Sequence, residues 1–89
     1  MKLETPEQAE SFKPHVQDLL GQQCREKHLS FGLTIVEFSQ EADWTYFVVK
    51  PDQDSIRIYD YADVLSNVET HLRRDEQVEN VLLVPALAA

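Results

Sequence analysis

The sequence contains little cysteine and glycine and no long hydrophobic run. Its single cysteine, Cys24, cannot form a disulfide within the chain, and its two glycines are too far apart to build a glycine-rich phosphate-binding loop. The longest stretch without polar or charged side chains, residues 81–89, falls far short of the ~20 residues that cross a bilayer. The first residues contain no apolar stretch of signal-peptide type, so we expect a cytoplasmic protein with no membrane segment.

Basic side chains are also scarce. Eight Lys and Arg residues stand against sixteen Asp and Glu residues, which gives a formal net charge of -8. A nucleic-acid backbone or an anionic membrane is bound by clustered cations, and these eight are scattered among acids, so we expect neither partner. The same charge favours a basic protein partner through long-range attraction.

The chain nevertheless has enough apolar material for one core, since 43% of its residues are hydrophobic and 27% are charged. We expect a single globular α+β domain over residues 1–89. Its first helix is marked by Thr5 as the N-cap, Pro6 at the first helical position and Gln8 three residues after the cap. We expect this helix to end near His28, and to kink or break just before Pro14 because proline lacks the N–H that a helix requires.

Three strands are predicted next. Residues 31–39 and 44–50 are rich in β-branched and aromatic side chains, and a short polar segment between them suits a hairpin. Residues 51–54 have turn chemistry, and residues 55–59 are predicted to form the third strand of an antiparallel meander.

A second helix is predicted from Asp60, as N-cap, to Arg74, followed by a strand over residues 78–84. The fold class is therefore α+β, a two-layer sandwich in the order α-β-β-β-α-β. Its sheet is expected to be four-stranded and mainly antiparallel, with both helices on one face. The last strand runs parallel to the third and can lie beside the third or the first.

Strand alternation divides the predicted sheet into two sets of side chains. The set assigned to the helices is Leu33, Ile35, Phe47, Val49, Ile56 and Ile58. The opposite set is unusually apolar for a face that two helices leave open, and it contains Val36, Phe38, Trp44, Tyr46, Val48, Arg57 and Tyr59.

Because Trp, Tyr and Arg are enriched at interface hot spots, we predict that this second face binds a protein partner. The predicted partner-binding residues are Phe38, Trp44, Tyr46, Val48, Arg57 and Tyr59. Two simpler arrangements stay open, namely a β-bulge that reverses one strand and a C-terminal tail, residues 85–89, that folds over the sheet.

Candidate catalytic and metal-binding residues are few. Cys24 and His28 are four residues apart and would share a helical face, but two ligands do not make a metal site. We interpret them as a buried thiol and a cation near a helix end. His71 would act as an acid or base only beneath a cleft, so no catalytic residue, metal or cofactor is predicted.

The leading hypothesis is a non-catalytic, acidic protein-interaction module of the adaptor, chaperone-like or inhibitor type. We expect it to form a homodimer through its aromatic sheet face. One alternative is an immunity-type inhibitor of a basic toxin. Another is a small ligand-binding protein or enzyme with a pocket between helices and sheet.

Overall fold

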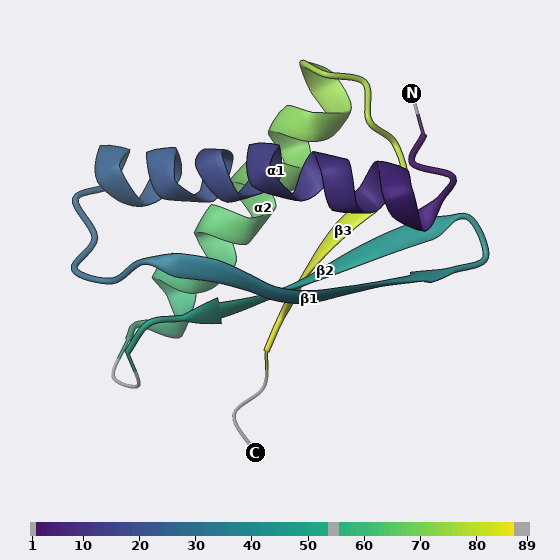
Figure 1. Ribbon diagram of the computed structural model, residues 1–89. Helices are drawn as coiled ribbons and strands as arrows, with labels where there is room; N and C mark the ends of the chain where they lie inside the picture. Colours follow the sequence, from purple (N-terminus) through teal and green to yellow (C-terminus); the bar gives the residue numbers. More distant parts are fainter. Residues whose placement is uncertain (1, 54–55, 87–89) are drawn as a thin grey trace.

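The computed structural model describes residues 2–53 and 56–86, and it places two helices on one side of a three-stranded sheet (Figure 1). The elements in chain order are α1 (Pro6–Glu26), β1 (Leu33–Glu41), β2 (Trp44–Pro51), α2 (Ile58–Arg74) and β3 (Val81–Pro85). The α+β class agrees with the sequence prediction, and so does the covering of one sheet face by both helices. The predicted number of strands, four, and the predicted element order are wrong, because the described residues form three strands.

Helix α1 begins as the sequence predicts. Thr5 is the N-cap, where its side-chain oxygen accepts a hydrogen bond from the Gln8 N–H at 3.2 Å, and the Gln8 side chain accepts one from the Thr5 N–H at 3.1 Å. Of the predicted kink or break before Pro14, the break is wrong, because α1 runs as one helix to Glu26. Pro14 and Glu10 are both exposed, so water can satisfy the Glu10 carbonyl that loses its helical donor.

A β-bulge in β1 changes which side chains face the helices. Ile35 lies opposite Val49 and Glu37 lies opposite Val48, so Val36 is an extra residue between two paired positions. Because side chains alternate along a strand, an extra residue reverses the facing of every position beyond it.

The third predicted strand, residues 55–59, is not found in its described part, residues 56–59. Ser55 lies outside the described residues, and α2 starts at Ile58 with Arg57 rather than Asp60 as its N-cap. The β-branched and aromatic composition of this segment favoured a strand, but in the structure Tyr61 is buried in the first turn of α2 while Ile58 and Tyr59 are exposed.

The loss of that strand also changes the sheet. Its order is β1-β2-β3, where β1 and β2 are antiparallel while β2 and β3 are parallel. The sheet is therefore mixed, not mainly antiparallel, and α2 is the crossover between its two parallel strands.

The core lies between the sheet and the helices. Its largest fully buried side chains are Phe47, Leu20, Leu72, Val16, Val49, Val64, Val68, Val78 and Val81. The N-terminal segment belongs to this core, because Leu3 is buried and its N–H and C=O are bound by the buried amide of Asn80 at 2.9 and 2.8 Å. The same amide donates to the Asp43 carbonyl at 2.7 Å, so Asn80 joins three separate segments. Neither described helix is long and apolar enough to cross a membrane.

Candidate interaction surface

The sheet side that faces away from α1 and α2 is called the outer face below. Register and burial place on it Thr34, Val36, Glu37, Ser39 and Glu41 of β1, Trp44, Tyr46, Val48 and Lys50 of β2, and Leu82 and Val84 of β3. Both helices lie on the other side of the sheet (Figure 1). Within residues 2–53 and 56–86, no helix or strand covers the outer face.

The centre of the outer face is apolar. Tyr46 lies between Ser39 and Leu82 in one cross-strand row, and Val48 lies between Glu37 and Val84 in the next. Trp44 and Val36 remain 39% and 50% exposed, whereas the four apolar residues of these two rows are half-buried by their neighbours. A solvated sheet face is normally polar, so this one has the composition of a surface that another molecule covers.

Three of the six predicted partner-binding residues lie together on the outer face, namely Trp44, Tyr46 and Val48. The placement of Phe38 there is wrong. The bulge at Val36 turns Phe38 toward the helices, where its ring lies 6.1 Å from that of Phe47.

The placement of Arg57 and Tyr59 on the sheet is also wrong. Arg57 is the N-cap of α2, with its guanidinium 3.7 Å from the Asp60 carboxylate, and Tyr59 is 75% exposed in the first turn. Leu82 and Val84 are two outer-face residues that the prediction missed. Their alternation with buried Val81 and Leu83 is hidden in an apolar run whose composition is typical of a fully buried strand.

Side chains from the helices form hydrogen bonds with backbone groups at both edges of the sheet. At the β1 edge, the Gln17 amide donates to the Leu33 carbonyl at 2.7 Å and accepts from the Ile35 N–H at 2.9 Å. At the β3 edge, a Glu69 carboxylate oxygen accepts the Leu83 N–H at 3.0 Å. An added strand would compete with these bonds, so the outer face is better suited to binding a partner than either edge.

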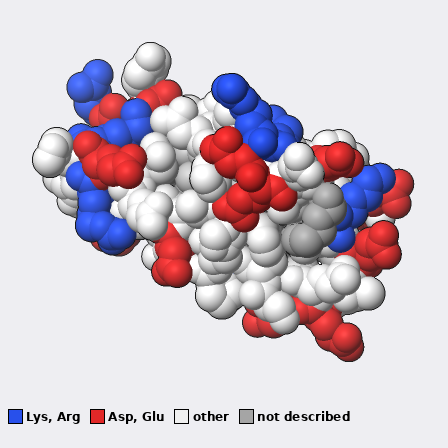
Figure 2. Space-filling model, turned by 90° about the horizontal axis from the view of Figure 1, so that it is seen from above, with Lys and Arg blue, Asp and Glu red and all other residues white. Residues whose placement is uncertain are grey.

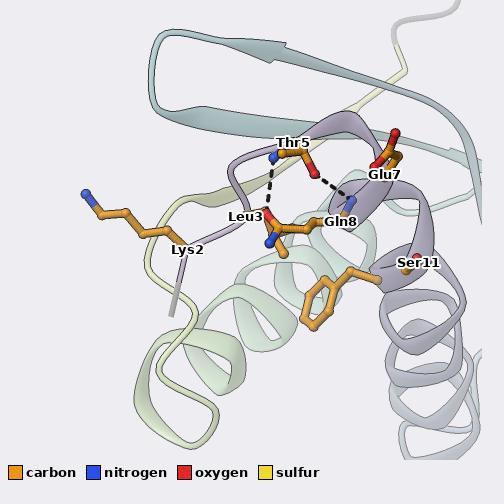
Figure 3. A pocket seen from close by; sticks show the side chains of 7 residues that line it. Lys2, Leu3, Thr5, Glu7, Gln8 and Ser11 are labelled. Atoms are coloured by element: carbon orange, nitrogen blue, oxygen red, sulfur yellow. Dashed lines mark hydrogen bonds between the residues drawn. The ribbon is translucent and has the colours of Figure 1, made fainter.

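Three notable hollows lie on the described surface, and one of them borders the outer face at Trp44. The largest, about 550 Å³, is beside the start of α1, where the capping pair Thr5 and Gln8 lies at its wall (Figure 3). A second, about 300 Å³, separates α2 from β3 and is lined mainly by apolar side chains, with Ser66 and Glu69 as its polar groups. A third, about 340 Å³, lies near the β1–β2 turn. None of the three is lined by a histidine or by the cysteine.

His71 lies in an ion-pair cluster at the end of α2. Its Nδ1 lies 2.9 Å from Asp75 and its Nε2 lies 2.8 Å from Glu76, whose carboxylate also approaches His15 Nε2 of α1 at 2.7 Å. The cluster links α1 to the segment that follows α2, which is a structural task. No group of three or more His, Cys, Asp and Glu side chains in the described part of the chain is arranged to hold a metal ion.

Cys24 and His28 do not share a helical face. Cys24 is buried, while His28 follows the C-cap of α1 in a left-handed conformation, with φ 55°. Burial raises the pKa of the Cys24 thiol, and the nearby negative charge of Asp52 raises this pKa further. Both effects keep the sulfur protonated, which suits a packing group and not a nucleophile.

No protein-family model, curated protein or solved structure matches this chain.

Proposed function

We propose that this protein is a non-catalytic protein-interaction module that binds its partner through the outer face. The observation that carries this proposal is the apolar centre formed by Tyr46, Val48, Leu82 and Val84, with Trp44 beside it, on a sheet side that no described helix or strand covers. Flat aromatic and β-branched surfaces of this kind resemble one half of a sheet-on-sheet interface.

The distribution of charge also supports the outer face as the binding surface. Only Glu37, Glu41 and Lys50 are charged on the outer face, out of 24 charged side chains in the chain. Seen from the helix side, acidic and basic side chains are spread over the surface (Figure 2). Interface cores are depleted of charge, so the outer face fits that role and the helix side does not.

A site-specific photo-crosslinker captures a partner of any identity and therefore tests the proposal directly. Benzoylphenylalanine replaces Tyr46 on the outer face in one variant and exposed Gln22 on α1 in the other, and both variants are irradiated inside the source cell. We expect a discrete protein adduct from position 46 and none from position 22. Equal labelling at both positions, or no adduct from position 46, would contradict the proposal.

A further inference from the structure

We infer that the partner bound at the outer face is a second copy of this chain, packed across a twofold axis that lies between the two sheets and at right angles to their strands. The inference rests on the proposed function and adds the identity of the partner and the direction of packing. It follows from how charge and shape are arranged along β2 and its neighbours.

The two ends of the outer face carry opposite charge. Lys50 is at the C-terminal end of β2, where it lies opposite Thr34. Glu41 is at the other end, opposite Trp44 and about 20 Å away along the strand. Neither Lys50 nor Glu41 has an ion-pair partner among the described residues, although Lys27 and Arg73 each have one within the chain.

A twofold axis across the strands reverses their direction in the second copy. Lys50 of each copy then lies over the Trp44 and Glu41 end of the other, where the ammonium group meets a carboxylate and an indole ring. A twofold axis along the strands would instead bring the two Lys50 groups together. Charge therefore favours one of the two aligned arrangements of a sheet-on-sheet dimer.

The apolar rows are complementary in the same arrangement. Because the axis passes near the middle of β2, Tyr46 of one copy lies over Val48 of the other. Leu82 meets Val84 on β3 in the same way, so a larger side chain faces a smaller one in both rows. On β1, Glu37 falls opposite Ser39, which avoids a like-charge contact at the centre.

The size of the outer face sets the affinity that we expect for the dimer. Residues 44–50 of β2 and the width of three strands give a flat area of about 20 Å by 14 Å on each copy. This is well below the roughly 800 Å² per partner of a standard specific interface, so we expect a weak, reversible dimer.

Sedimentation equilibrium of the purified chain, from about 10 µM to about 1 mM, tests the inference. We expect a 10.3 kDa monomer that shifts toward twice that mass as the concentration rises. Lys50→Glu alone and Glu41→Lys alone should each weaken association by about tenfold, because each creates two like-charge contacts. Glu10→Lys on the exposed side of α1 is the matched control and should leave the dimer intact.

A mixture of the two charge variants gives the sharpest result. A heterodimer of Lys50→Glu with Glu41→Lys pairs opposite charges at both ends, so the mixture should associate as the parent does. A parent chain that stays monomeric throughout, or a mixture no tighter than its components, would overturn the inference. A foreign protein crosslinked at position 46 together with a monomeric parent would overturn it too, while leaving the proposed function intact.

Discussion

The carboxylate of Glu69 accepts a hydrogen bond from the backbone N–H of Leu83 at 3.0 Å, so a helix side chain satisfies an outward-facing donor of the edge strand β3. The Thr45 N–H donates to the Asn80 carbonyl, and the Ala86 N–H donates to the Val49 carbonyl. The backbone N–H and C=O groups of even-numbered residues along this segment therefore point toward β2. Those of odd-numbered residues point away from β2, toward the open edge of the sheet. Pro85 has no N–H, so Glu69 and Pro85 together remove two donors from this edge.

We predict that Glu69→Ala lowers the free energy of unfolding by about 1–2 kcal/mol, because it leaves the Leu83 N–H without its acceptor. Glu69→Gln keeps an acceptor oxygen but loses the charge that pairs with Arg73, so it should cost less. Urea denaturation of both variants measures the difference. Equal losses in the two variants would show that the Arg73 ion pair, and not the hydrogen bond to the Leu83 N–H, accounts for the lost stability.

The bulge residue Val36 gives a second prediction. Its deletion would make Ile35, Glu37 and Phe38 consecutive, so simple alternation would keep Ile35 and Phe38 in the core and Glu37 on the outer face. We expect this deletion to cost less than ~1 kcal/mol of stability, whereas deletion of Thr34 makes the buried residues Leu33 and Ile35 adjacent, forces one of them out of the core and should cost at least ~2 kcal/mol. Val36→Thr keeps the residue count and a β-branched side chain at an exposed site, so it should change stability by less than ~0.5 kcal/mol. A Val36 deletion as destabilising as the Thr34 deletion would contradict the assigned register.

Asn80 gives a third prediction, because its buried amide donates to two carbonyls, those of Leu3 and Asp43. Asn80→Asp replaces the donating group with a carboxylate oxygen that faces both acceptors. We expect a loss of more than ~2 kcal/mol at neutral pH, and a partial recovery at acidic pH once the carboxyl is protonated and can donate again. Asn80→Ala is the control, and its loss should not depend on pH in this way.

Tyr61 gives a prediction for alkaline pH. Its hydroxyl donates to the Val49 carbonyl and accepts from the Ala86 N–H at 3.2 Å, and burial raises its pKa above the ordinary value. The folded state then holds this proton more tightly than the unfolded state, so its contribution to stability is complete below pH ~10 and declines as the pH rises through the folded-state pKa.

The variant Tyr61→Phe tests this relationship. We expect it to be less stable than the parent by about 1–2 kcal/mol at pH 7, with a gap that narrows above pH ~10. Tyr59→Phe alters a tyrosine that is 75% exposed and should show neither effect. Thermal denaturation across the pH series gives the comparison, and a gap that widens above pH ~10 would contradict the assigned environment of Tyr61.

The features predicted correctly from the sequence are those that local chemistry determines. The capping box at Thr5 and the hairpin between β1 and β2 depend on residues close together in the chain, and both are present. The facing of Trp44, Tyr46 and Val48 is predictable because β2 contains no bulge. These three residues form the part of the outer face that the sequence alone identifies.

The errors come from features that neighbouring residues do not determine. A bulge that reverses one strand is one of the alternatives that the sequence leaves open, but nothing in the composition of β1 marks Val36 as the extra residue, so the sequence does not place the reversal at Phe38. The segment before Asp60 has good strand propensity, but it follows a central strand and joins the crossover helix instead. Tertiary packing overrides local propensity at both places.

The most direct test of the outer face as the interaction surface is the comparison of crosslinking at positions 46 and 22 in the source cell. A single adduct, formed only from position 46 and having the mass of two copies of the chain, is the result we predict. Adducts of similar yield from both positions, or a chain that remains uncrosslinked at position 46, would contradict it.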